Sequence, residues 1–139
     1  MKVSFDYDDT LSRVEVEEYA KRLVAEGHQV WIVTARPSEE HLKMTFKGGE
    51  KPDWNREVFE AAGRIGIPNE RIKFMNYTDK IEFLRGNGFT FHLDDDGYEL
   101  YQIMLSGDIC ETIDSRMLYW RNACDNAIKR RSLMGMVEK

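Results

Sequence analysis

The stretch Val3-Ser4-Phe5-Asp6-Tyr7-Asp8-Asp9-Thr10-Leu11 decides the fold that this sequence predicts. Its first three residues suit a β-strand, and acidic residues with a threonine follow directly. Polar side chains just after a buried strand are typical of open parallel sheets, in which the carboxyl ends of the strands line a shared crevice. The stretch therefore predicts the first strand of such a sheet and one part of a candidate site.

Apolar, β-rich runs alternate with amphipathic segments along the remaining sequence, which favours βα units and a parallel sheet covered by helices. Strands are expected at residues 3–5, 30–33, 72–75, 89–93 and 109–113. The last run alternates apolar and polar residues and so favours an edge strand with one solvated face. A chain of 139 residues is long enough for one such domain, spanning residues 1–139, and too short for two ordinary ones.

Helices are expected between the strands. The first starts at a capping box formed by Ser12 and Glu15 and ends at Gly27. Further helices are expected at residues 53–65, 79–85, 98–105 and 115–131, and a short one at 38–46. Helical spacing places Trp54 on the buried face of the helix at 53–65 and Met117 on that of the last helix.

The composition, with 42% hydrophobic and 32% charged residues, is that of a folded globular protein. Apolar runs reach only four or five residues, so neither a membrane span nor a signal peptide is expected. Cys110 and Cys124 lack a larger cysteine framework and are expected to be free buried thiols, which favours the reducing cytoplasm. A formal net charge of -5 disfavours sequence-independent binding of nucleic acid through its phosphates.

Charged and hydroxyl side chains follow several of the predicted strands. They are Asp6, Asp8, Thr34, Lys80, Asp94 and Asp95. Because the carboxyl ends of parallel strands meet at one edge of the sheet, these side chains are expected to converge. Carboxylates that lie so close repel one another unless a cation neutralises them, and oxygen ligands favour Mg²⁺ over zinc. Magnesium sites commonly handle phosphate groups, for which Thr34 and Lys80 can supply a hydroxyl and an ammonium.

The order of these motifs resembles that of the haloacid dehalogenase (HAD) superfamily of phosphohydrolases. The resemblance covers essentially the whole chain and rests on Phe5-Asp6-Tyr7-Asp8-Asp9-Thr10-Leu11, then Thr34, Lys80 and Phe91-His92-Leu93-Asp94-Asp95. It implies a three-layer, Rossmann-like α/β sandwich with a five-stranded, mainly parallel sheet in the order 5-4-1-2-3. Family members commonly carry a cap after the first motif or after the third strand. The spacing here leaves room for neither, so no cap domain is expected.

The resemblance also implies a role for each matching residue. Asp6 would attack phosphorus to form an aspartyl-phosphate, and Asp8 would protonate the leaving oxygen and then deprotonate the attacking water. Asp6, the backbone carbonyl of Asp8 and Asp94 would hold Mg²⁺, with Asp95 in direct contact or one shell further out. By the same resemblance, the aspartate at position 8 favours phosphate ester hydrolysis or phosphoryl transfer over dehalogenation.

The sequence does not identify the substrate. Nucleotides, nucleic-acid ends, sugar phosphates and phosphoproteins all fit an uncapped crevice, which a second copy of the chain could also close as a homodimer. The long connection at 35–52 carries a candidate substrate rim, and the alternative is an ordinary crossover that packs on the sheet. The rim residues are Arg36, Lys43 and Lys47.

Asp9 and Asp96 are expected to be turn or helix-cap residues, and His92 a hydrogen-bonded core residue.

Two other functions fit parts of the pattern. A signalling receiver has its acidic pair first and its lysine last, whereas here Lys80 precedes the acidic pair. A catalytically silent binding protein of the same fold would be marked by loss of Asp6, Asp8 or Lys80, and all three are present.

Overall fold

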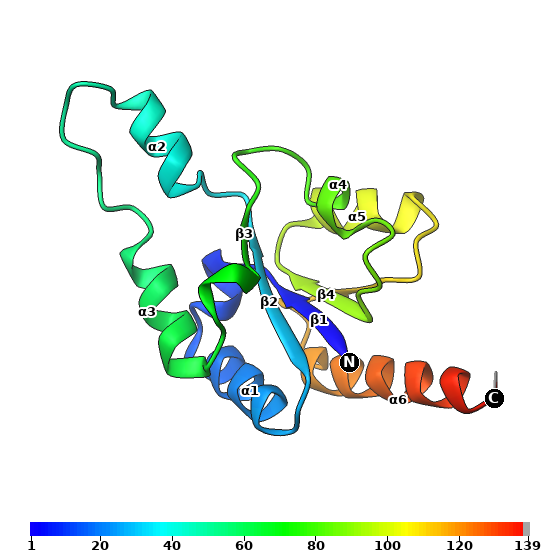
Figure 1. Cartoon of the computed structure of the whole chain (residues 1–139). Helices are drawn as coiled ribbons and strands as arrows, with labels where there is room; N and C mark the ends of the chain where they lie inside the picture. Colours follow the sequence, from blue (N-terminus) through cyan, green and yellow to red (C-terminus); the bar gives the residue numbers. More distant parts are fainter. Residues whose placement is uncertain (138–139) are drawn as a thin grey trace.

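The computed structural model describes residues 1–137 and shows an α/β domain with helices on both faces of one sheet (Figure 1). Within these residues the sheet has five strands, all parallel, in the order β3-β2-β1-β4-β5. The strands are β1 (Lys2–Phe5), β2 (Gln29–Thr34), β3 (Ile72–Phe74), β4 (Phe91–Asp94) and β5 (Glu111–Asp114). This is the predicted order 5-4-1-2-3, read from the opposite edge of the sheet. The prediction of β5 as an edge strand is also confirmed.

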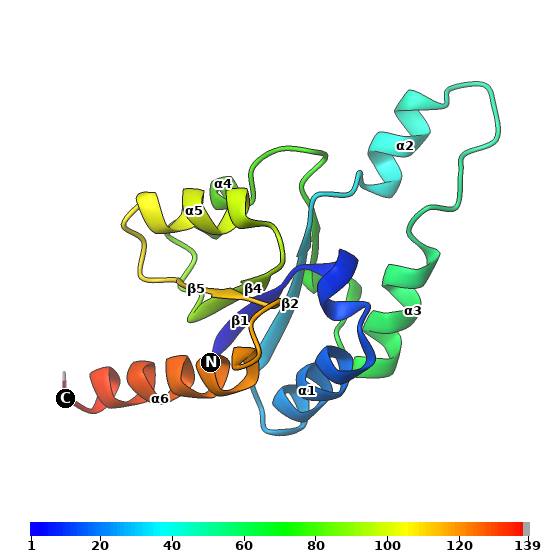
Figure 2. The same cartoon turned by 180° about the vertical axis from the view of Figure 1, so that it is seen from behind.

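Helices cover the sheet in two layers, which Figures 1 and 2 show from opposite sides. They are α1 (Val14–Ala25), α2 (Glu39–Thr45), α3 (Arg56–Ile65), α4 (Ile81–Leu84), α5 (Gly97–Leu105) and α6 (Trp120–Val137), with short turns η1 (Tyr7–Leu11) and η2 (Asn69–Arg71). On one face α1, α3 and α6 pack around Phe5 and Phe91, whose ring centroids lie 5.7 Å apart. On the other face α4 and α5 pack against Val33 and Phe89. The predicted three-layer sandwich is therefore confirmed.

Three details of the predicted helices are wrong. Ser12 does not cap α1, because its hydroxyl accepts a hydrogen bond from the backbone N–H of Asp9 at 3.1 Å and the helix begins at Val14. Trp54 precedes α3 and is 48% exposed, and Met117 precedes α6 and is 57% exposed. Both helices begin later than the spacing predicts, so these two side chains fall in turns outside the apolar stripe.

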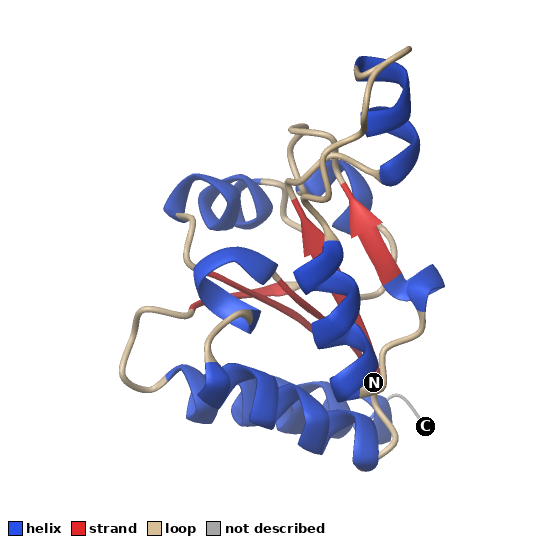
Figure 3. Cartoon of the chain, turned by 90° about the vertical axis from the view of Figure 1, so that its left-hand side faces the viewer, coloured by secondary structure: helices blue, strands red, loops and turns tan. Residues whose placement is uncertain are grey.

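The connection between β2 and α3 carries α2 beyond the carboxyl ends of the strands, as Figures 1 and 3 show. Ser38 caps this helix by accepting a hydrogen bond from the backbone N–H of His41 at 3.0 Å, which confirms the short helix predicted at 38–46. Leu42 is the buried residue of α2, and residues 43–50 are exposed. Among the described residues, no helix is long and apolar enough to cross a membrane.

Candidate functional site

Acidic side chains from several strand ends surround a hollow of about 270 Å³ at the carboxyl edge of the sheet. Its lining residues are Asp6, Asp8, Asp9, Ala35, Lys80, Asp94, Asp95 and Asp96. The structure thus brings together five of the residues predicted to form the site. The sixth, Thr34, is fully buried next to Ala35, and its hydroxyl accepts a hydrogen bond from the backbone N–H of Arg36 at 3.3 Å.

Lys80 lies at the centre of this cluster. Its ammonium donates to Asp6 Oδ1 at 2.8 Å and to Asp94 Oδ2 at 2.7 Å, and all three side chains are almost completely buried. The backbone N–H of Lys80 donates to Glu99 Oε2 at 2.9 Å, which ties the start of α4 to α5. Burial opposes the charge of Lys80, but the neighbouring carboxylates outweigh it and raise the pKa. Lys80 is therefore held in place as a cation.

His92 supports the cluster from within β4. Its Nε2 lies 2.8 Å from Asp94 Oδ2 and its Nδ1 lies 2.7 Å from the Ser4 hydroxyl, and the ring is fully buried. Burial lowers the pKa of His92, and the hydrogen bond with Asp94 only partly offsets this. The predicted role of His92 as a hydrogen-bonded core residue is confirmed, and the contact shows that it also orients Asp94.

The cluster carries more negative than positive charge. Burial raises the pKa of Asp6 and the charge of Asp94 raises it further, and the opposing charge and hydrogen bond of Lys80 do not offset the two together. Burial also disfavours ionisation of Asp94, but the hydrogen bonds with His92 and Lys80 and the charge of Lys80 outweigh it and lower the pKa of that carboxyl. Asp6 therefore needs a further cation beside it to stay ionised at neutral pH.

Carboxylate oxygens of Asp6, Asp94 and Asp95 lie within 4.8 Å of one another. The donor atoms are all hard oxygens, which suits Mg²⁺ and does not favour zinc. Three carboxylates against the single ammonium of Lys80 leave a charge that a divalent cation would balance. The side chains present thus fit a magnesium ion, with Asp8 lining the same hollow.

Thr10 and Ser115 connect Asp95 to the far edge of the sheet. The Thr10 hydroxyl donates to Asp95 Oδ1 at 3.4 Å and lies 3.0 Å from the Ser115 hydroxyl, and both hydroxyl residues are fully buried. The sequence analysis did not single them out as site residues. A signal was present, because Thr10 belongs to the first motif and Ser115 lies two residues after a predicted strand.

Arg36 binds Asp8, one of the residues that line the hollow. Its Nη2 donates to Asp8 Oδ1 at 2.7 Å and its Nε to Asp8 Oδ2 at 3.0 Å, and Nη2 also reaches Glu57. The guanidinium carbon lies 5.1 Å from the centroid of the Tyr7 ring. The hydrogen bonds with Asp8 raise the pKa of Arg36, so the residue is a permanent cation next to the predicted acid–base residue.

The other two residues of the predicted rim lie elsewhere. Lys43 and Lys47 on and after α2 line a separate hollow of about 260 Å³ with Glu40 and Met44. Asp9 and Asp96 have the predicted turn and cap geometry, although both also line the acidic hollow. Asp9 adopts a left-handed turn conformation with φ 58°, and Asp96 caps α5 by accepting from the backbone N–H of Tyr98 at 2.9 Å.

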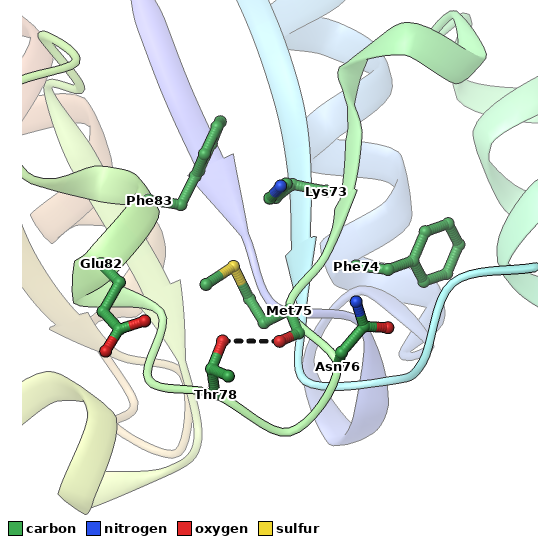
Figure 4. A pocket seen from close by; sticks show the side chains of 7 residues that line it. All are labelled: Lys73, Phe74, Met75, Asn76, Thr78, Glu82 and Phe83. Atoms are coloured by element: carbon green, nitrogen blue, oxygen red, sulfur yellow. Dashed lines mark hydrogen bonds between the residues drawn. The ribbon is translucent and has the colours of Figure 1, made fainter. Parts of the chain in front are cut away.

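A larger hollow of about 360 Å³ lies beside the edge strand β3 (Figure 4). Its lining includes Lys73, Met75, Thr78, Glu82 and Phe83, and none of the residues predicted to form the site. The Thr78 hydroxyl donates to the carbonyl of Met75 at 2.6 Å, as the dashed line in Figure 4 marks. One carboxylate and one ammonium in an open groove do not form a reactive constellation, so the acidic hollow stays the candidate site.

Comparisons with family models, with curated proteins and with solved structures gave no significant match to this chain. The functional argument therefore rests on the residues and their geometry.

Proposed function

We propose that this protein is a magnesium-dependent phosphatase that hydrolyses phosphate monoesters through an aspartyl-phosphate on Asp6. The observation that supports this most is the setting of the Asp6 carboxylate. It is almost completely buried at a strand end, lies 2.8 Å from the Lys80 ammonium and adjoins the carboxylates of Asp94 and Asp95. The resemblance of the motifs to those of the HAD superfamily favours the same reaction.

Asp6 would act as the nucleophile. One of its oxygens attacks phosphorus, and the bond between phosphorus and the leaving oxygen breaks as the acyl phosphate forms. Lys80 holds the attacking carboxylate and neutralises part of the negative charge that gathers on the phosphoryl oxygens. Thr34 can assist, because its hydroxyl oxygen accepts from the Arg36 N–H and the hydroxyl proton is left to donate to phosphate.

Asp8 would move the protons. It donates a proton to the leaving oxygen in the first step and takes one from the water that attacks the phosphoryl group in the second. Both oxygens of Asp8 are hydrogen-bonded to Arg36, so this role requires the ion pair to open. A phosphate dianion is the partner that can replace Asp8 on the guanidinium, which links substrate binding to the release of Asp8.

The metal would be held by Asp6, Asp94 and Asp95, with the backbone carbonyl of Asp8 as the further ligand that the resemblance implies. Bound there, Mg²⁺ would supply positive charge to the phosphoryl oxygens and lower the repulsion between the phosphate and Asp6. The products balance, since water contributes its hydroxyl to phosphate and its proton restores Asp8.

The test is release of inorganic phosphate from p-nitrophenyl phosphate and from a panel of nucleotides and sugar phosphates. We expect turnover that requires magnesium and that disappears in the isosteric variant Asp6→Asn. The matched control is Asp114→Asn, which changes an acidic residue at the end of β5 that does not line the hollow. Turnover that persists in Asp6→Asn, or that does not respond to magnesium, would contradict the proposal.

A further inference from the structure

A second hollow, of about 300 Å³, adjoins the acidic one. Its lining residues are Arg36, Pro37, Trp54, Glu57 and Tyr77. Arg36 belongs to its wall and at the same time binds Asp8, which lines the acidic hollow. The hydrogen bond between Arg36 and Asp8 thus connects the walls of the two hollows, so a group bonded to a phosphate at Asp6 could extend past Arg36 into the second hollow.

Two aromatic side chains stand exposed at this second hollow. Trp54 is 48% exposed and Tyr77 is 68% exposed, although large aromatic side chains are normally buried for most of their area. The rings of Trp54 and Phe46 pack in a T-shaped arrangement with centroids 5.8 Å apart, and this contact supports the indole. Aromatic rings displayed in a hollow offer flat faces on which another ring can stack.

The backbones of both aromatic residues are fixed to the segment that follows β2. Arg36 Nη1 donates to the carbonyl of Trp54, and the N–H of Tyr77 donates to the carbonyl of Ala35 at 2.8 Å. The neighbouring N–H of Asn76 donates to the carbonyl of Arg36 at 3.2 Å. Tyr77 has φ 65°, a left-handed conformation that is uncommon for a bulky residue and that turns its ring outward. The hollow is thus tied to the strand end that also carries Thr34.

We propose that Trp54, Tyr77 and Arg36 form a subsite for the base of a nucleoside monophosphate whose phosphate lies at Asp6. This inference rests on the proposed phosphatase function and names its substrate class. The two rings can stack on the flat face of a base, and Glu57 can accept a hydrogen bond from its amino group. A sugar phosphate without a base would leave this aromatic hollow unfilled.

The charge of the chain favours a single nucleotide over a nucleic-acid end. A mononucleotide carries its phosphate into the acidic hollow, where Lys80 and the metal would receive it. A polynucleotide would need several further cations along its backbone. The net charge is -5, and the two cations closest to Trp54 in the sequence are already paired, Lys51 with Glu39 and Arg56 with Asp53.

The experiment compares adenosine monophosphate with ribose-5-phosphate, which has the same phosphate and sugar but no base. The variants are Trp54→Ala and Tyr77→Asn, the latter chosen because asparagine tolerates the left-handed backbone. We expect each to lower kcat/KM for adenosine monophosphate about tenfold, the effect of losing one base-stacking contact, and to leave ribose-5-phosphate within about twofold. Tyr101→Ala, which removes a 52% exposed ring from α5, is the control and should change neither.

A binding measurement separates this inference from the proposed reaction. In the Asp6→Asn background, calorimetric titration with adenosine monophosphate should show the same tenfold weakening by Trp54→Ala, whether or not the wild type hydrolyses it. Equal effects on both ligands, or no effect of either ring, would overturn the subsite while leaving the phosphatase standing. A phosphorylated oligonucleotide that is hydrolysed faster than the mononucleotide would contradict the choice of substrate class.

Discussion

Lys80 and Arg36 each hold an aspartate that follows β1, but they do so in different surroundings. The side chains of Lys80, Asp6 and Asp94 are 3%, 8% and 0% exposed. Those of Arg36, Asp8 and Glu57 are 18%, 55% and 61% exposed. Both groups contain one cation and two carboxylates, so the comparison isolates the effect of burial.

Burial gives the two groups different roles. A buried ion pair cannot exchange its partner for water without a large penalty, so Lys80 fixes the Asp6 carboxylate, the proposed nucleophile, in one position. An exposed pair contributes little to stability and exchanges readily, so the proposed mechanism requires only that Arg36 release Asp8 to a phosphate. The comparison teaches that burial fixes the side chain of Asp6, whereas exposure leaves the pair of Asp8 and Arg36 free to open.

The largest effect is expected when the buried cation is removed. Without magnesium, Lys80→Met should lower the free energy of unfolding by about 3–5 kcal/mol, because it leaves Asp6 and Asp94 facing each other in a buried site. Urea unfolding measures this, and Lys73→Met, at an exposed lysine of β3, should stay within about 0.5 kcal/mol. Similar losses of unfolding free energy in both variants would show that burial does not distinguish Lys80 from an exposed lysine.

A second test adds magnesium, the cation proposed to bind beside Lys80, Asp6 and Asp94. Magnesium at about a hundred times its dissociation constant should raise the free energy of unfolding of the wild type by about 2.7 kcal/mol. Asp94→Asn should abolish most of this gain, whereas Asp114→Asn, at the end of β5 and outside the lining of the hollow, should retain it. Thermal unfolding with and without magnesium measures the difference. A gain that survives in Asp94→Asn would place the cation elsewhere.

A third test concerns His92, which contacts Asp94 of the buried group from within β4. His92→Leu removes a partner from both Asp94 and the Ser4 hydroxyl, and the unpaired buried groups should lower the free energy of unfolding by about 1–3 kcal/mol. The control His41→Leu changes an exposed histidine of α2 and should have little effect on urea unfolding. Equal stability of His92→Leu and the wild type would show that Asp94 does not depend on this contact.

The smallest effect is expected in the exposed group. Glu57→Gln removes one of the two carboxylates on Arg36 and should change the free energy of unfolding by less than about 1 kcal/mol. The change should shrink further in high salt, because exposed charges are screened. A loss comparable with that of Lys80→Met, measured by the same urea titration, would show that the two groups do not differ as their burial predicts.

The strand ends could be predicted from the sequence because each signal is local. An apolar run followed by Asp6, by Thr34 or by Asp94 is enough to place a polar residue at the carboxyl edge of a parallel sheet. The strand order was predicted from the resemblance to a known family and not from these local signals. The acidic hollow, with Lys80 between two of its carboxylates, is the physical result of these local patterns.

Other features had no local signal. The contact between Thr10 and Ser115 joins residues 105 positions apart, and only the folded sheet brings them together. The exposed position of Trp54 depends on where α3 begins, and helical spacing alone does not fix the first residue of a helix. The pairing of Arg36 with Asp8 likewise joins two loops, so the sequence could place both near the site without predicting their bond.

The central claim is that Asp6 carries the phosphoryl group during turnover, and the variant Asp8→Asn with p-nitrophenyl phosphate tests it most directly. The p-nitrophenolate leaves without a proton, so the first step should proceed, whereas the second step lacks the residue that activates water. After acid quenching, peptide mass spectrometry should therefore find a phosphoryl group on Asp6. Burst release of p-nitrophenolate without a modified Asp6, or a phosphoryl group on another residue, would contradict the account.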